Sequence, residues 1–134
     1  MELTGACLCG AVRYRYSGDV LRRAVCHCRD CQRASGSAFH FGIVVPRKGF
    51  ALTRGALRSY RTTGDSGRWL DRSFCPTCGS GILHELEARG PDIVVIKAGT
   101  LDDPAIIVPD YEIFVRSKLP WVAIEAETEK PDRV

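Results

Sequence analysis

Seven cysteines are the residues of this sequence best suited to chemistry, and they fall into three short clusters. The clusters are Cys7 with Cys9, then Cys26, Cys28 and Cys31, and finally Cys75 with Cys78. Thiolates at such short spacings are typical ligands of zinc, which binds sulfur about 2.3 Å away in tetrahedral sites. The odd number of cysteines, their short spacings and the lack of an export signal argue against a disulfide framework.

Glycines divide these clusters into two sites. Cys9 and Cys78 are followed directly by Gly10 and Gly79, whereas Cys31 is followed by a glutamine. A glycine at that position suits a tight turn with positive φ, in which backbone amides turn toward the sulfurs. We therefore pair the two glycine-ended clusters into one four-thiolate site. That site holds Cys7, Cys9, Cys75 and Cys78, and the second site holds Cys26, Cys28 and Cys31.

The two sites have different expected roles. Four protein ligands close a structural zinc site, whereas three leave a position for water or substrate. We therefore expect two zinc ions per chain, one structural and one catalytic, with Cys26, Cys28 and Cys31 as the catalytic set. In extended backbone His27 points away from Cys26 and Cys28, which argues against His27 as the fourth ligand. Its role stays open between a proton shuttle and a histidine that only supports the site.

The segments that carry the clusters are predicted to be mostly short strands. Residues 11–16 alternate between apolar residues and arginines, which predicts a half-buried strand, and residues 20–25 are expected to return beside it toward Cys26. Residues 29–34 are the best candidate for a helix. Further strands are expected at 39–45, 50–53, 57–62, 68–74, 80–87, 92–98 and 111–116, with 50–53 and 57–62 paired as a hairpin and 111–116 as the last strand.

Length and composition favour one water-soluble domain over the whole chain. The chain has 134 residues, 45% of them hydrophobic and 26% charged, so we expect a single domain over 1–134. Its core should span about 3–123, and the polar tail 127–134 should be frayed. No segment resembles a membrane span or a signal peptide, so we expect a cytoplasmic protein with reduced cysteines.

Charge is distributed unevenly along the chain. Residues 1–80 hold 13 Lys and Arg against 5 Asp and Glu, whereas residues 81–134 hold 6 against 11. A basic environment could draw a small anionic substrate toward the middle cluster. The alternative, which we slightly favour, is that the fold mixes the two halves into an ordinary surface. Because the chain has no basic tail, a nucleic-acid partner is not expected.

Three segments together resemble the glutathione-dependent formaldehyde-activating enzyme family. They are residues 5–14 (GACLCGAVRY), 26–36 (CHCRDCQRASG) and 74–80 (FCPTCGS), and residues 98–104 (AGTLDDP) also fit. The resemblance implies an Mss4-like fold of several coiled antiparallel β-sheets. It implies a structural zinc on Cys7, Cys9, Cys75 and Cys78. It implies a second zinc on the middle three cysteines, where the family's chemistry is placed. The implied reaction joins formaldehyde to the glutathione thiol, giving S-hydroxymethylglutathione, and is classed with carbon–sulfur lyases.

Several side chains near the middle cluster are candidates for substrate binding. Arg29 and Arg33 could hold the carboxylates of glutathione, and Gln32 and Ser35 could hydrogen-bond it. Each also has a plain structural reading, as a surface arginine or a helix-end residue. His40 and His84 lie in strand-like segments and are expected to be structural. For the aromatic residues Phe39, Tyr111 and Trp121, packing onto the body of the domain is favoured over lining a pocket.

One departure from the family and one competing function stay open. Many relatives are expected to carry a histidine within 109–114, where this chain has none. If that histidine shapes their site, the substrate here is expected to differ from theirs. The main alternative function is a non-catalytic zinc-binding module for protein or nucleic acid, and another is a zinc enzyme with an unrelated substrate. A histidine that permanently closed the middle site would weigh against every enzyme reading.

Overall fold

The computed structural model describes residues 1–64 and 66–128, which form mostly short strands around one helix. The strands are β1 (Glu2–Ala6), β2 (Arg13–Ser17), β3 (Arg22–Cys26), β4 (His40–Pro46), β5 (Phe50–Arg54), β6 (Arg58–Thr63), β7 (Trp69–Phe74), β8 (Gly81–Leu86), β9 (Ile93–Lys97), β10 (Tyr111–Ile113) and β11 (Glu127–Thr128). Helix α1 (Arg29–Ser35) directly follows the middle cysteine cluster, and five 3-10 turns join other elements: Arg47–Gly49, Glu87–Arg89, Ala98–Thr100, Pro104–Ile106 and Val115–Ser117. No helix in these ranges is long and apolar enough to cross a membrane.

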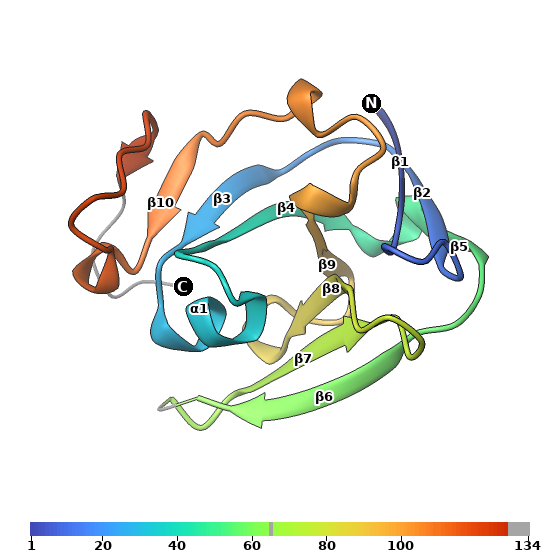
Figure 1. Ribbon diagram of the computed structural model, residues 1–134, viewed down its shortest axis with the longest axis horizontal. Helices are drawn as coiled ribbons and strands as arrows, with labels where there is room; N and C mark the ends of the chain where they lie inside the picture. Colours follow the sequence, from blue (N-terminus) through green and yellow to red (C-terminus); the bar gives the residue numbers. More distant parts are fainter. Residues whose placement is uncertain (65, 129–134) are drawn as a thin grey trace.

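The strands form two sheets. A small sheet has the order β1-β2-β5, and a large one has the order β11-β10-β3-β4-β9-β8-β7-β6 (Figure 1). Pairing is antiparallel except at β10, which runs parallel to both β3 and β11. The prediction of a mostly β, Mss4-like fold with one short helix is confirmed, and β9 is a central strand as predicted.

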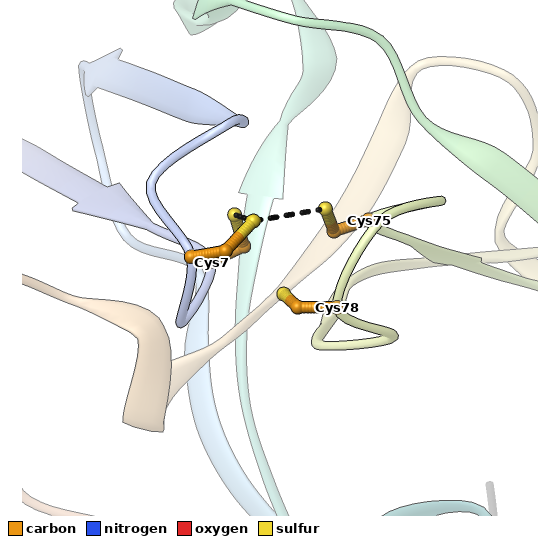
Figure 2. Close-up of side chains that lie close together, drawn as sticks. Cys7, Cys75 and Cys78 are labelled. Atoms are coloured by element: carbon orange, nitrogen blue, oxygen red, sulfur yellow. Dashed lines mark hydrogen bonds between the residues drawn. The ribbon is translucent and has the colours of Figure 1, made fainter.

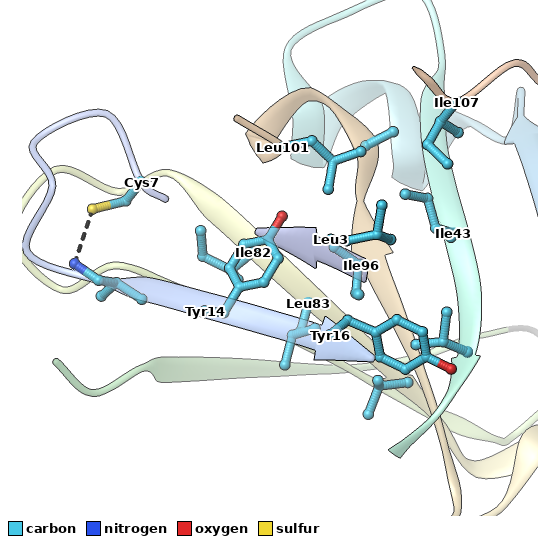
Figure 3. Packing of buried hydrophobic residues seen from close by; sticks show 14 of the residues in the cluster. Leu3, Cys7, Tyr14, Tyr16, Ile43, Ile82, Leu83, Ile96, Leu101 and Ile107 are labelled. Atoms are coloured by element: carbon cyan, nitrogen blue, oxygen red, sulfur yellow. Dashed lines mark hydrogen bonds between the residues drawn. The ribbon is translucent and has the colours of Figure 1, made fainter. Parts of the chain in front are cut away.

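The hydrophobic core lies where the two sheets face each other. Tyr14 and Tyr16 of β2 are both 1% exposed and pack into the same cluster as Ile43 of β4 and Ile96 of β9 (Figure 3). Arg15, between these tyrosines, is exposed, as the alternating pattern of β2 requires. Cys7 also belongs to this cluster. One of the predicted metal-binding cysteines therefore packs within the hydrophobic core.

Two predicted strand pairings are wrong. Residues 50–53 and 57–62 do form strands, but β5 pairs with β2 in the small sheet while β6 pairs with β7 in the large one. Phe50 explains the separation, because its ring stacks on Tyr14 at 5.4 Å and holds β5 in the small sheet. Likewise β3 does not return beside β2 and pairs instead with β4 and β10.

The C-terminal region differs from the prediction in two ways. Strand β10 ends at Ile113, because Phe114 adopts a left-handed conformation (φ 54°) before a 3-10 turn, and it is not the last strand, since β11 follows. Trp121 does not pack onto the body, being 74% exposed. The predicted polar tail begins with β11, and its residues 129–134 lie outside the described residues.

Candidate metal centres

Two loops from opposite sheets bring four cysteines together. Cys7 and Cys9 lie in the loop between β1 and β2, and Cys75 and Cys78 lie in the loop between β7 and β8 (Figure 2). Their four sulfur atoms all lie within 4.8 Å of one another. The predicted pairing of the two glycine-ended clusters is therefore seen in the structure. All seven cysteines of the chain are free thiols.

Backbone geometry in both loops follows the glycines. Gly10 and Gly79 each have φ 79°, a conformation that costs glycine little and other residues more. In each loop a backbone amide reaches the first sulfur: Val12 N lies 3.2 Å from Cys7 Sγ, and Thr77 N lies 3.4 Å from Cys75 Sγ. Such amides stabilise negative thiolates, which suits a site that must hold deprotonated sulfur.

The spacing of these sulfurs fits a tetrahedral zinc ion. A zinc–sulfur distance near 2.3 Å in tetrahedral geometry puts neighbouring sulfurs about 3.8 Å apart. Cys7 Sγ lies 3.6 Å from Cys9 Sγ, which in turn lies 3.8 Å from Cys75 Sγ. Hydrogen bonds from the hydroxyl and the backbone N–H of Ser80 lower the pKa of Cys78 to about 5, so this thiol ionises readily.

The middle cluster forms a second site at the junction of β3 and α1. Cys26 ends β3, Cys28 caps α1 and Cys31 lies in the first turn of that helix, with the three sulfurs within 4.8 Å of one another. We call these residues the thiol trio. Cys28 is extended (φ −61°, ψ 151°), and its sulfur accepts a hydrogen bond from Cys31 N at 3.3 Å.

The thiol trio contains one readily ionised thiol, Cys28, and no described residue closes it as a fourth ligand. Hydrogen bonds from the Cys26 and Cys31 thiols are the main cause of a strongly lowered pKa for Cys28, with smaller help from the backbone N–H of Cys31 and the charge of Arg72, against the opposing effect of burial. Among the described residues, no further Cys, His, Asp or Glu joins the group. Three thiolates leave one position of a tetrahedral ion for another ligand.

A large cleft opens beside the thiol trio. It has a volume of about 1130 Å³ and is lined by all three thiols and the segment after β10. It is also lined by the face of the large sheet that carries Gly42 and Val44, which alternation turns away from the core residue Ile43. Five arginines line the cleft, namely Arg29, Arg68, Arg72, Arg89 and Arg116. Asp30 is the acidic residue among the described lining. The cleft therefore combines a candidate metal site with a strongly positive wall.

Comparison with known proteins places this geometry in a family. The model of the family described as glutathione-dependent formaldehyde-activating enzyme matches residues 2–117. The chain belongs to this family. A solved Rhodobacter sphaeroides protein, a structural genomics target, is similar to the chain with a TM-score of 0.58 and 24% identity, covering 74% of this chain and 87% of that one. No curated protein sequence matches the chain.

In this family member the segment expected to carry a histidine supplies Glu112 instead. Glu112 is 2% exposed and its Oε1 accepts from His27 Nε2 at 2.8 Å and from Lys118 Nζ at 2.9 Å. His27 is fully buried and does not line the cleft. Its ring therefore faces Glu112 and not the cleft, and a proton-shuttle role finds no support in its position.

Breaking this buried network should destabilise the protein. We expect Glu112→Gln to lower the free energy of unfolding by about 3 kcal/mol, because it leaves Lys118 and His27 without their carboxylate partner. Urea unfolding of the metal-loaded protein measures the change. The matched control is Asp110→Asn on the same segment, whose half-exposed ion pair with Arg23 should contribute at most about 1 kcal/mol. Equal effects of the two substitutions would contradict this assignment.

Three of the four predicted substrate-binding residues, Arg29, Gln32 and Arg33, line one shallow depression beside Phe39 and Trp121. Arg29 also lines the large cleft, whereas Arg33 does not. Gln32 is 5% exposed and its amide nitrogen donates to the carbonyls of His27 and Ser117. The Ser35 hydroxyl donates to Cys31 O at 2.7 Å, inside the helix end.

Other aromatic and charged residues are placed in ways that the sequence left open. Phe39 contacts the His27 ring edge-on at 6.0 Å, and Arg22 lies over the ring of Tyr111 at 4.1 Å. The acidic second half partly neutralises the basic first half, for example through Arg13 and Asp102, 2.6 Å apart. Mixing of the two halves is therefore real, although the cleft keeps its excess of arginines.

The residues that line the cleft away from the thiol trio could not be grouped from the sequence. Arg72 of β7 and His84 of β8 line it and are direct cross-strand neighbours. Lys97 is outside the lining, and burial lowers its pKa to about 8 against the opposing charges of Cys31 and Cys26. Strand alternation alone puts Arg72 and Leu70 on one face. What the sequence lacked was the order of strands that brings this face over the thiol trio.

Proposed function

We propose that the protein is a zinc-dependent enzyme of the carbon–sulfur lyase type that acts on a small thiol adduct. The favoured reaction is the reversible joining of glutathione and formaldehyde to S-hydroxymethylglutathione. One observation carries the proposal, namely three clustered thiols that open onto a cleft with no fourth protein ligand among the described residues. A cytoplasmic location is proposed with it, because a reducing compartment keeps seven thiols available for metal, and residues 1–134 are proposed to act as one domain.

The proposed reaction is a simple addition of a thiol to a carbonyl group. In the forward direction the substrate's S–H bond and the carbonyl π bond break, an S–C and an O–H bond form, and the thiol proton ends on the oxygen. A zinc ion bound by Cys26, Cys28 and Cys31 would supply a fourth position for the substrate sulfur and lower the pKa of its thiol. The protein's own contribution is to orient the substrate, hold its charges and keep the sulfur against the trio.

The arginine-rich wall supports an anionic substrate. Glutathione carries two carboxylates, and arginine matches carboxylate geometry through paired N–H donors. Arg68 and Arg89 are exposed side chains at this cleft, so they can reach a ligand that extends out of it. Of the residues predicted from sequence, Arg29 also lines the cleft and is kept as a candidate contact.

Removing one of these cleft charges should weaken substrate binding. We expect Arg68→Gln and Arg89→Gln each to raise the KM for the glutathione adduct about tenfold, with little change in kcat, because each removes a charge-assisted hydrogen bond. Steady-state kinetics at low and high salt measure the effect. Arg58→Gln on β6 is the matched control, since Arg58 is exposed and does not line the cleft. A KM that rises equally in the control would contradict carboxylate recognition by the cleft.

The direct test of the function is catalysis above the spontaneous rate. Glutathione and formaldehyde are mixed with zinc-loaded protein, and the approach to equilibrium is followed at several protein concentrations. The proposal expects a rate that rises in proportion to the protein. A rate equal to that of the protein-free mixture, with zinc bound at the trio, would favour the non-catalytic zinc-binding module instead.

A further inference from the structure

Two buried histidines line the cleft beside the thiol trio, and the chemistry above uses neither. His40 begins β4 and His84 lies in β8, and their rings stack with centroids 4.4 Å apart and an interplanar angle of 25°. The two residues are 5% and 3% exposed, yet both belong to the cleft lining. They form a pair, which we call the imidazole pair.

Strand register places the imidazole pair between the thiols and a cationic side chain. His40 lies directly opposite Cys26 in the β3–β4 ladder, and His84 lies directly opposite Arg72 in the β7–β8 ladder. Directly opposite residues project from the same face of a sheet. One face of the large sheet therefore carries, in order, a thiol of the trio, the two imidazoles and an arginine.

One ring nitrogen of each histidine in the imidazole pair lacks a hydrogen-bond partner within the described protein. Nε2 of His40 and Nε2 of His84 are both buried and make no hydrogen bond to any described residue. An unpaired buried polar atom is costly, so such atoms usually meet a ligand or water. Gly42 leaves room for the His40 ring, because an added Cβ there would lie only 2.6 Å from His40 Cε1.

Burial, with smaller help from nearby positive charges, keeps the imidazole pair neutral. Burial is the main cause that lowers the pKa of His40, to about 3, and the positive charges of Lys97 and Arg72 act in the same direction against the opposing charge of Cys28. Burial likewise lowers the pKa of His84, with further lowering by His40, Lys97 and Arg72. A neutral imidazole offers one N–H donor and one acceptor nitrogen. That combination suits a hydroxyl or carbonyl oxygen, whereas the arginines suit carboxylates.

We propose that Nε2 atoms of His40 and His84 hydrogen-bond the oxygen of the substrate's hydroxymethyl or carbonyl group while its sulfur lies at the thiol trio. The inference rests on the proposed function and adds the residues that recognise the oxygen. In the adduct, one Nε2–H donates to the oxygen and the hydroxyl donates to the other Nε2. When the sulfur attacks the carbonyl carbon, an Nε2–H donor that is already in place stabilises the negative charge that develops on the oxygen.

Nitrogen NMR of the zinc-loaded protein tests this contact directly. Protein labelled with ¹⁵N at histidine and in its backbone amides is mixed separately with glutathione plus formaldehyde, with formaldehyde alone and with S-methylglutathione, which lacks the oxygen. We expect only the glutathione–formaldehyde adduct to shift the Nε2 signals of both His40 and His84. Bound adduct, seen from shifted amides of Cys28 and Arg29, with both Nε2 signals unmoved would overturn the inference. So would an equal Nε2 shift with S-methylglutathione.

The same experiment separates this inference from the proposed function. If neither the glutathione–formaldehyde mixture nor S-methylglutathione moves any amide signal at the trio, the proposed function itself fails and the inference fails with it. A kinetic arm then asks whether the contact matters to turnover. His84→Phe keeps the stacked ring but removes its nitrogens, and we expect kcat/KM for the adduct to fall about tenfold while inhibition by S-methylglutathione stays unchanged. Equal loss of both, in a variant with wild-type zinc content, would mean a structural role only.

Discussion

Cys78→Ser is expected to leave the chain largely unfolded at 25 °C. The four-thiol site joins the loop between β1 and β2 to the loop between β7 and β8, and two of its thiols, Cys7 and Cys75, lie in the hydrophobic core. A structural zinc site of this kind contributes about 10–16 kcal/mol at neutral pH. Whole domains are stable by only about 5–15 kcal/mol, so the loss of most of that binding energy exceeds what the rest of the core can supply.

Circular dichroism and thermal melting, with zinc and with a chelator, measure this effect. The matched control is Thr77→Ala in the same loop, because Thr77 is exposed and its side chain is not a ligand. The control should melt like the wild type, and a chelator should make the wild type resemble Cys78→Ser. A folded Cys78→Ser protein with the wild-type melting temperature would show that the four-thiol site does not hold the two sheets together.

Cys28→Ser is expected to abolish catalysis while the protein stays folded. Cys28 belongs to the thiol trio, so its loss removes a ligand from the proposed catalytic metal and should bring the rate down to the spontaneous one. The fold should tolerate the change, because Cys28 is also the residue that caps α1, and serine is among the best residues for that position. Activity, zinc content and the unfolding curve are measured on the same preparation.

Cys28→Ala separates the two roles of this residue. Both substitutions remove the ligand, but only alanine removes the cap, which should cost about 1 kcal/mol of stability. We therefore expect equal loss of activity in both variants and a lower unfolding midpoint in Cys28→Ala alone. Catalysis by Cys28→Ser above the spontaneous rate would rule out the proposed role of the thiol trio.

The grouping of the thiols into two candidate metal sites could be predicted from sequence because short-range signals point to it. Spacing alone grouped the cysteines, and the glycines after Cys9 and Cys78 identified which two clusters belong together. Helix α1 was predictable for the same reason, since its cap and its αL glycine at position 36 are local signals. In each case the decisive residues lie within a few positions of one another.

The cleft could not be predicted because it depends on contacts between distant segments. Nothing local shows that β5 pairs with β2 through Phe50 and Tyr14, or that β7 and β8 lie in the same sheet as β3. The partner of His27 was equally hidden, because Glu112 is 85 residues away along the chain. Exposure of Trp121 was missed because a large aromatic residue near the end of a small domain is more often buried.

Zinc content per chain is the measurement that tests the division into two sites most directly. Wild type, Cys28→Ser and Thr77→Ala are prepared under reducing, chelator-free conditions and analysed for metal and for protein. Our account predicts about two zinc ions per chain in the wild type and in Thr77→Ala, and about one in a folded Cys28→Ser. One zinc ion in the wild type, unchanged in Cys28→Ser, would contradict the account, because the thiol trio would then hold no metal.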